Sequence, residues 1–325
     1  MTRLLYSSAL AVAGALLLVP VVRPQQVSIT PRTKAAEAAE TALDRRADIR
    51  VDTTEIRIPV TVTQQKDGKF VTGMDAGYFE LWEDKIKQEI LSFTSEDAPL
   101  SVGVVFDASG SMGVKITKSR QAVAQFLRRA NPEDEFFLVQ FNDRAVMTVP
   151  FTTDSTEILN RLAFVQSKGS TALLDGVYIA MNHMKKARNA RKAILIISDG
   201  GDNSSRYTES EVKNAVREAD VQIYAIGIFE QGGTSTPEEI AGPGLLGQLT
   251  DQTGGHHYAV GNLADLPDVA AKIGLELRNE YVLGYRSTNL ARDGKYRKVE
   301  VKLVNVSKLP KLRSRARGGY YAPSQ

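Results

Sequence analysis

Two runs of the chain consist only of apolar residues and glycine, and they limit the fold more than any other feature. Val102–Phe106 and Ala193–Ile197 lack charged side chains and show no alternation of polar and apolar positions. Such runs are typical of parallel strands covered on both faces. Segments with the helical period, including Lys115–Ala130 and Ala172–Ala187, follow or precede them. This alternation predicts an α/β fold with a doubly wound, mostly parallel, Rossmann-like sheet.

The flanks of this region have the two-residue period of half-buried strands. Ile56, Ile58, Val60 and Val62 alternate with polar residues or proline, and strand-like segments return from Tyr281 onward. A β unit of about fifty residues buries too little apolar surface to be stable alone. We therefore expect the flanks to form one small β-sandwich with the α/β domain inserted in it, rather than two independent β domains.

Changes in period and composition predict six parts along the 325-residue chain. At about 150 residues per domain, this length suits two domains. The predicted parts are a signal peptide or N-terminal anchor (1–24), a polar, Ala-rich linker (25–50), the N-terminal half of the β-sandwich (51–97), the α/β domain (98–265), a connecting helix (266–280) and the C-terminal half of the β-sandwich (281–325).

The N-terminus has the features of an export signal. Arg3 precedes an apolar run from Leu4 to Val22, and a polar segment follows directly. No small-x-small cleavage site ends the run, so an uncleaved anchor is an alternative, although the run is short for a membrane span. We expect an exported protein that is periplasmic, in the cell envelope or secreted, and that contacts a membrane only through such an anchor.

The composition excludes several kinds of site. The chain has no cysteine, which rules out disulfides, thiolate metal sites and cysteine nucleophiles. Its formal net charge is only +3, so the overall charge does not indicate nucleic acid or an acidic membrane as a partner. The adjacent His256 and His257 would face opposite sides of a strand, which is poor geometry for a shared zinc ion.

Oxygen-bearing side chains cluster where predicted strands end or helices begin. Asp107–Ser111 follows the first buried strand, Gly169–Thr171 precedes a helix, and Asp199 follows the most apolar strand. Ligands of open α/β sheets bind beyond the carboxyl ends of the strands. Carboxylates and hydroxyls without sulfur or imidazole suit Mg²⁺, Mn²⁺ or Ca²⁺, and we expect Mg²⁺. The predicted ligands are Asp107, Ser109, Ser111, Thr171 and Asp199.

This pattern resembles the metal-ion-dependent adhesion site (MIDAS) of von Willebrand factor A (VWA) domains, in order and spacing, over about Leu100 to Asp265. The flanks are similar to those of bacterial VWFA-related proteins of the acidobacterial type. The similar segments are Val60-Thr61-Val62 with Asp67-Gly68-Lys69, Phe79–Asp84, and Arg315–Pro323.

The resemblance implies a role for each predicted ligand. Ser109, Ser111 and Thr171 would offer hydroxyls to the metal, directly or through water. Asp107 and Asp199 would act largely through bound waters. One coordination position would remain for an Asp or Glu carboxylate of a partner protein. The implied function is metal-dependent protein binding or adhesion outside the cytoplasm, without catalysis.

Two further acids are candidates for positions that support the metal site. Asp175 lies one helical turn after Thr171 and could orient that loop, and Asp202 lies three residues after Asp199. The alternative interpretation is a helix-surface charge or local cap for Asp175 and a turn residue for Asp202.

Two other functions remain open. A metal-dependent phosphoesterase would use a similar oxygen cage together with a cation, for which Lys115 or Lys168 is available. A scaffold subunit would hold the metal for structure only. The chain has neither a Gly-x-Ser-x-Gly motif nor a Gly-x-x-x-x-Gly-Lys-Ser/Thr phosphate loop, which argues against two common enzyme classes.

A basic cluster near the C-terminus is a further candidate site. Arg313, Arg315 and Arg317 share one face of a predicted strand, close to Lys308 and Lys311. Charges on an edge strand commonly prevent aggregation. A polyanion site is the alternative, but no aromatic residues interleave to stack on bases, so we expect no nucleic-acid partner.

Overall fold

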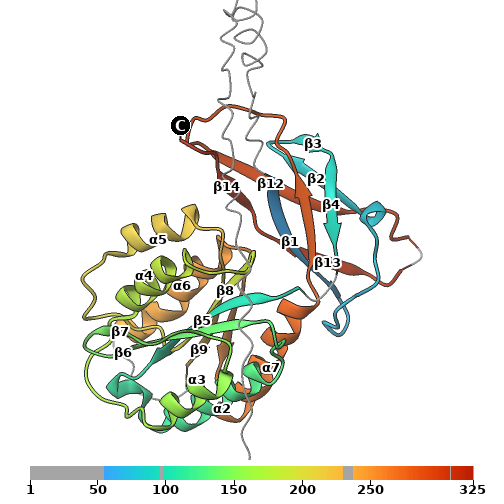
Figure 1. The fold of residues 1–325 in the computed structure, drawn as a ribbon. Helices are drawn as coiled ribbons and strands as arrows, with labels where there is room; N and C mark the ends of the chain where they lie inside the picture. The colour runs from blue at the N-terminus through green and yellow to red at the C-terminus, as the bar shows by residue number, and fades with distance from the viewer. Residues whose placement is uncertain (1–54, 96–97, 230–236, 308, 325) are drawn as a thin grey trace, which may run out of the picture. The chain divides into compact units, whose positions relative to one another are not determined.

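The computed structural model describes residues 55–95, 98–229, 237–307 and 309–324 (Figure 1). All of them belong to one compact unit of the chain. The predicted export signal and linker, residues 1–50, lie outside the described residues. Among the helices that are described, none has the length and apolar character needed to cross a membrane.

A six-stranded sheet forms the centre of the α/β domain. Its order is β10-β9-β8-β5-β6-β7, and every neighbouring pair is parallel except β6 and β7. All eight residues of the central strand β5 are buried, as expected for a strand covered on both faces. The strands are β5 (Leu100–Asp107), β6 (Glu135–Phe141), β7 (Ala145–Thr152), β8 (Arg191–Ser198), β9 (Gln222–Ile228) and β10 (His257–Val260).

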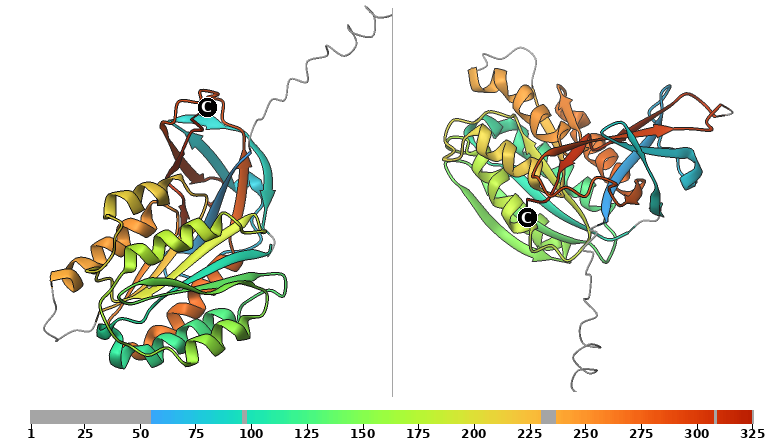
Figure 2. Two further views of the ribbon diagram at one scale, coloured as in Figure 1. Left: turned by 60° about the vertical axis from the view of Figure 1, so that its left-hand side comes forward. Right: turned by 90° about the horizontal axis from the view of Figure 1, so that it is seen from above.

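Helices cover both faces of this sheet (Figures 1 and 2). Val104 packs into one core with α2, α3 and α7, whereas its neighbour Val105 packs into the other core with α4, α5 and α6. Successive strand residues point to opposite faces, so one apolar run supplies both cores. The predicted doubly wound α/β fold is therefore confirmed. The helices are α2 (Ile116–Leu127), α3 (Ser155–Ala163), α4 (Leu173–Met184), α5 (Glu209–Glu218), α6 (Pro237–Asp251) and α7 (Leu266–Arg278).

The two flanks form the expected β-sandwich. Its sheets have the orders β13-β1-β11-β4 and β14-β12-β2-β3, so each combines strands from both ends of the chain. Strand β1 lies between two C-terminal strands and pairs antiparallel with both. The strands are β1 (Ile56–Gln64), β2 (Phe79–Glu83), β3 (Ile86–Gln88), β4 (Ile90–Thr94), β11 (Tyr281–Tyr285), β12 (Tyr296–Leu303), β13 (Leu312–Ala316) and β14 (Gly319–Tyr321).

Two segments of the structure differ from what the sequence pattern predicts. Phe70 and Val71, two apolar residues that would suit a short return strand after β1, form no strand, and Phe70 makes only an isolated bridge with Thr63. The segment expected as a connecting helix is α7, and its apolar residues, among them Ile273, belong to the core that α2 also lines. Helix α7 therefore covers the sheet as well as leading into β11.

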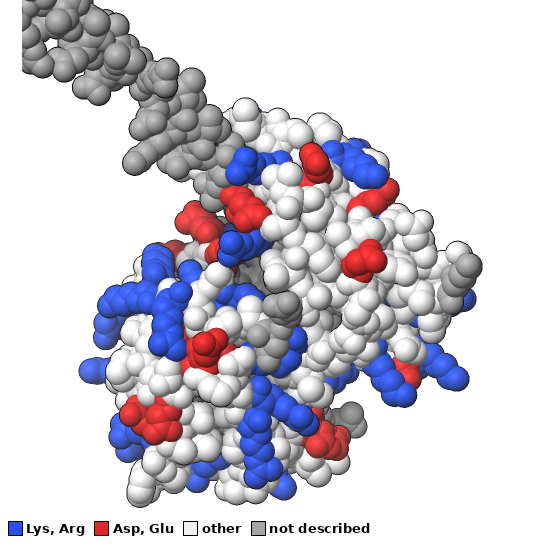
Figure 3. Space-filling model, turned by 45° about the vertical axis from the view of Figure 1, so that its right-hand side comes forward, with Lys and Arg blue, Asp and Glu red and all other residues white. Residues whose placement is uncertain are grey.

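The basic C-terminal strand faces the α/β domain. Arg317 Nη1 lies 2.9 Å from Asp220 Oδ1, and Arg315 Nη1 lies 3.9 Å from the buried Glu276. Two of the three aligned arginines thus have acidic partners within the protein. Lys and Arg side chains are interspersed with Asp and Glu over the face drawn in Figure 3.

Candidate metal centre

Asp107 is the last residue of β5, and its side chain is completely buried. Its Oδ1 accepts a hydrogen bond from the Ser109 backbone N–H at 2.8 Å. Its Oδ2 accepts from the Ser198 hydroxyl, at the end of β8, at 2.5 Å. These bonds fix the carboxylate between the first and third loops of the predicted site.

The Asp107–Ser111 loop turns directly into a short 3-10 helix, η2 (Gly110–Lys115). The Ser109 and Ser111 hydroxyl oxygens lie 3.0 Å apart. Gly110 donates its N–H to the Gly169 carbonyl at 2.9 Å, and a Cβ at Gly110 would lie only 3.2 Å from that oxygen. The lack of a side chain at Gly110 therefore lets the two loops approach closely. Glycine also allows the backbone to bend at this position.

The loop that follows Asp199 fixes Thr171. The Thr171 N–H donates to Asn203 Oδ1 at 2.9 Å. The Thr171 carbonyl accepts from the N–H groups of Asn203 and Ser204 at 3.0 and 3.1 Å. The Thr171 side chain, which is only 6% exposed, thereby lies beside the loop that begins at Asp199.

Asp199 contributes the second buried carboxylate. Its Oδ2 pairs with Lys115 Nζ at 3.2 Å, and the two side chains are 2% and 12% exposed. Its Oδ1 is buried and has no hydrogen-bond partner among the described residues. Burial, and secondly the nearby charge of Asp199, raise the pKa of Asp107 to about 7. The two carboxylates are thus close enough to repel each other, and Lys115 pairs with Asp199.

The backbone at Gly200 allows the chain to turn after Asp199. Gly200 has a φ of +82°, which is favourable only for glycine, and a Cβ there would lie 2.8 Å from the backbone of Gly242 in α6. Gly200 also donates its N–H to the Ser198 hydroxyl at 3.0 Å. The turn therefore keeps Ser198 oriented toward Asp107.

The two predicted supporting acids tie the loops to helix α4. Asp175 Oδ1 accepts from the N–H groups of Arg206 and Tyr207 at 2.8 and 3.1 Å. Asp202 Oδ1 accepts from the Leu174 N–H at 3.2 Å, and burial raises the pKa of Asp202. Each acid therefore bridges the start of α4 and the loop after β8.

Three residues of this centre had no assigned part in the predicted ligand set. Ser198 and Asn203 orient Asp107 and Thr171, and Lys115 occupies one oxygen of Asp199. The sequence indicates Lys115 only as a cation available for phosphate. A strand ending in Ser-Asp was the only sequence signal for Ser198, and nothing in the sequence singled out Asn203.

The donors fit a hard divalent cation. They are carboxylate and hydroxyl oxygens, and one buried carboxylate oxygen lacks a partner. Among the described residues, no group of three or more His, Cys, Asp or Glu comes together as a metal site. A cation at this place would therefore depend on the serine and threonine hydroxyls and on water as well as on the two acids.

Parts of this chain are similar to one family model and to several known proteins. Residues 102–201 match the family model described as the von Willebrand factor type A domain. An uncharacterized protein of Borreliella burgdorferi is 27% identical over 189 residues, which are 50% of this chain and 54% of that protein. Inter alpha-trypsin inhibitor, heavy chain 4, of Mus musculus is 27% identical over 143 residues, which are 39% of this chain and 15% of that protein.

The chain therefore spans about half the length of the first relative and a small part of the second. Among solved structures, a von Willebrand factor type A protein from Catenulispora acidiphila is 13% identical, with a TM-score of 0.49. The similarity covers 82% of this chain and 72% of that one.

Proposed function

Because the chain contains a von Willebrand factor type A domain, a kind of domain that commonly mediates adhesion or protein binding, we propose that it binds a partner protein through a divalent cation. Asp107, Ser109, Ser111, Thr171 and Asp199 would hold the cation, which we take to be Mg²⁺. When bound, the cation would supply a coordination position for an Asp or Glu carboxylate of the partner.

The observation that carries this proposal is the unsatisfied oxygen of Asp199. Buried polar atoms are almost always hydrogen-bonded, so each exception needs an explanation. Asp199 is close enough to the Asp107 carboxylate for their charges to interact, and Asp107 in turn bonds to Ser109, whose hydroxyl lies 3.0 Å from that of Ser111. A cation would satisfy Asp199 Oδ1 and would reduce the repulsion between Asp107 and Asp199.

The protein's own residues prepare the site. Ser198 and the Ser109 N–H hold Asp107 in one orientation, and Asn203 holds the Thr171 loop. Lys115 neutralises part of the charge of Asp199. Because these contacts fix the loops, little ordering should remain to be done when a partner arrives.

A phosphoesterase is less well supported by these contacts. It would need a cation that is free to bind phosphate. The Lys115 ammonium is nearly buried and paired with Asp199, so only Lys168 of the two candidate lysines would serve in that role. Sustained Mg²⁺-dependent turnover of a generic phosphoester would support the enzyme instead. A purely structural metal would be supported if the loaded protein bound no carboxylate-containing ligand.

The metal site is tested with the metal itself. We expect saturating Mg²⁺ to raise the free energy of unfolding of the wild type by about 3 kcal/mol at a hundredfold excess over the dissociation constant. Asp107→Asn and Thr171→Ala should lose this gain. Ser170→Ala removes a neighbouring hydroxyl outside the predicted ligand set, so it should keep the gain. Equal Mg²⁺ stabilisation of Asp107→Asn and wild type would refute the assigned ligands.

Partner binding is tested with a defined probe. Short random peptides displayed on phage are selected on the immobilised protein in Mg²⁺ and eluted with chelator. We expect every recovered peptide to contain an Asp or Glu whose replacement by Asn or Gln abolishes binding. Recovery of peptides whose binding is insensitive to chelator would contradict metal-dependent binding. Failure to recover any peptide would contradict it as well.

Location outside the cytoplasm is also part of the proposal. It rests on Arg3 and the apolar run from Leu4 to Val22, which lie outside the described residues. Fractionation of the native host should place the protein outside the cytoplasm, free or anchored. Recovery of all of it in the cytoplasmic fraction would contradict export.

A further inference from the structure

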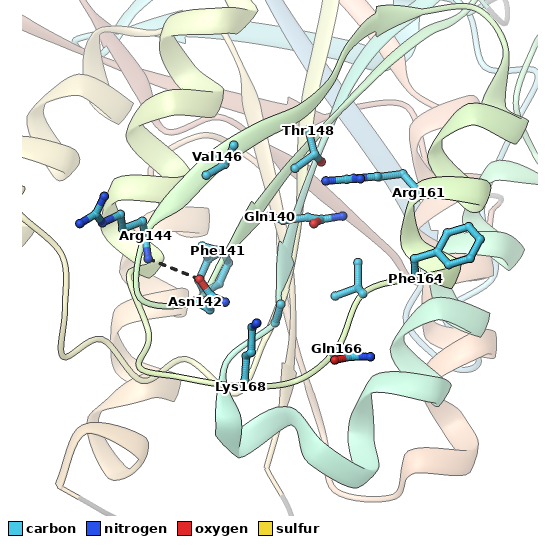
Figure 4. A pocket seen from close by; sticks show the side chains of 12 residues that line it. Gln140, Phe141, Asn142, Arg144, Val146, Thr148, Arg161, Phe164, Gln166 and Lys168 are labelled. Atoms are coloured by element: carbon cyan, nitrogen blue, oxygen red, sulfur yellow. Dashed lines mark hydrogen bonds between the residues drawn. The ribbon is translucent and has the colours of Figure 1, made fainter.

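A cavity of about 330 Å³ lies beside the Asp107–Ser111 loop, between strand β7 and the end of helix α3. We call it the β7–α3 groove (Figure 4). None of the five predicted metal ligands lines it, although Ala108, between two of them, does. The lining residues used below are Ala108, Gln140, Val146, Arg161, Phe164 and Lys168.

The groove carries unpaired positive charge. Arg161 extends into it from α3, and Lys168 extends into it from the loop on the opposite side (Figure 4). Both residues are exposed, and neither forms an ion pair with any described residue. A third cation, Arg144, lies at the rim, with its side chain directed away from the cavity in this view.

Apolar surface and an unsatisfied amide accompany this charge. Phe164 is 83% exposed and Val146 is 53% exposed, so both present apolar surface to solvent at the groove. The Gln140 Nε2 is buried and has no hydrogen-bond partner among the described residues. The groove therefore offers an apolar contact, a neutral donor and two cations to one ligand.

Hydrogen bonds connect the groove to the metal loop. The Lys168 N–H donates to the Ala108 carbonyl at 2.9 Å, and the Ser167 hydroxyl donates to the Ser109 carbonyl. Ala108 itself donates its N–H to the Phe141 carbonyl at 2.8 Å. The residue between two predicted metal ligands therefore also lines the groove, which places the groove next to the candidate metal site.

We propose that the β7–α3 groove binds an acidic segment of the partner, in which a second carboxylate lies near the one that reaches the metal. The second carboxylate pairs with Arg161 and Lys168, and an apolar side chain of the segment packs on Phe164. This inference rests on the proposed function, because the first carboxylate is anchored at the metal site. Charge complementarity selects an acidic peptide over a neutral one.

The test uses the full chain and the peptides selected in Mg²⁺. We expect them to contain two acidic residues and an aromatic or aliphatic one. Arg161→Glu combined with Lys168→Glu should weaken their binding about tenfold or more, because exposed pairs contribute modestly and reversal adds repulsion. The matched control, Arg128→Glu combined with Lys185→Glu, makes the same charge change at exposed positions on the ends of α2 and α4 and should bind normally.

A second measurement separates direct pairing from general charge. Changing the second acid of a selected peptide to its amide should weaken binding to wild type by about tenfold, whereas binding to the Arg161→Glu, Lys168→Glu variant should not weaken, because the change removes a repulsion there. Thermal unfolding of each variant with and without Mg²⁺ reports whether the fold and the metal site are intact.

The possible outcomes distinguish the two proposals. Chelator-sensitive peptides that need one acid only, or that bind the groove variant and the wild type equally, would overturn the groove while leaving the metal-dependent function intact. Loss of binding in the control variant as well as in the groove variant would also overturn it, because only overall charge would then matter. Peptides insensitive to chelator and to Asp107→Asn would overturn both.

Discussion

Buried carboxylates lie at both ends of the central sheet, and the two ends differ in whether every carboxylate oxygen has a partner. At the amino end, Glu280 is buried and accepts from Arg191 at 3.0 Å and from Gln222 at 2.7 Å. At the carboxyl end, Asp107 and Asp199 are equally buried, yet Lys115 is the one cation that pairs with them among the residues the structure describes. One end satisfies its carboxylate fully, and the other leaves an oxygen of Asp199 without a partner.

This difference separates a structural cluster from a binding site. The amino-end cluster connects β8 and β9 of the α/β domain to the residue before β11, the first C-terminal strand of the β-sandwich. A complete set of partners at that place holds two parts of the fold together. The carboxyl-end acids link segments within the α/β domain only, through Ser198 and Lys115, and their incomplete pairing is what a cation can complete. The comparison predicts opposite responses to substitution at the two ends.

The largest effect is expected at the amino end. Arg191→Ala would leave the Glu280 carboxylate buried without its cation, which typically costs about 3–5 kcal/mol of unfolding free energy. Chemical denaturation measures the loss. Adding Glu280→Gln should restore part of the stability, because the double variant buries no charge there. A loss below about 1 kcal/mol would mean that this cluster is no more essential than an exposed ion pair.

The loss in Arg191→Ala should depend on pH. Burial raises the pKa of Glu280 above its ordinary value of 4.5, and Arg191 opposes that increase. A raised folded-state pKa means that the folded state takes up a proton more readily than the unfolded state, so stability falls as the pH rises above 4.5. Removing Arg191 enlarges this effect. The deficit of the variant should therefore be greatest at neutral pH and should shrink toward pH 4.5, whereas a pH-independent deficit would point to lost packing alone.

An intermediate effect that metal reverses is expected at the carboxyl end. Lys115→Met removes the only cation that pairs with Asp199 among the described residues. In chelator we expect a loss of about 2 kcal/mol, because the buried Asp199 carboxylate is left without a hydrogen-bond partner among the described residues. In saturating Mg²⁺ the loss should largely disappear, and the affinity for Mg²⁺ should rise, because the ammonium no longer competes for Asp199.

Calorimetric titration of Mg²⁺ and denaturation in chelator check this prediction. Lys118→Met, one turn along α2, is the matched control and should change neither quantity. A Lys115→Met protein that loses Mg²⁺ affinity would show that the lysine supports the metal rather than replacing it, and the contrast between the two ends would be weaker.

The smallest effect is expected for a solvent-exposed ion pair at the amino end of the central sheet. Asp220 is paired with Arg317 at 2.9 Å, but its side chain is 71% exposed. Asp220→Ala should cost less than about 1 kcal/mol, because water screens the pair. Denaturation alongside Arg191→Ala tests this. A cost similar to that of Arg191→Ala would show that burial does not determine the strength of these contacts.

The sequence by itself determined the kind of fold and the identity of the candidate ligands. Strands such as Val102–Phe106 contain only apolar residues and glycine because both of their faces are covered, so their pattern predicts a doubly wound sheet. Asp107 and Asp199 end two such strands, and parallel strands place their carboxyl ends at one edge. Periodicity and position within the chain carry this information, and both are local.

Only the tertiary structure decided how these residues meet. The register of β5 and β8, with Phe106 opposite Ile197, brings Ser198 against Asp107, its partner 91 residues away. The turn after Asp107 brings Lys115 to Asp199 across 84 residues. The position of Arg161 and Lys168 in the β7–α3 groove, beside Ala108, likewise depends on the tertiary structure alone. Pairing of distant segments depends on the packing of the whole domain, which no local pattern encodes.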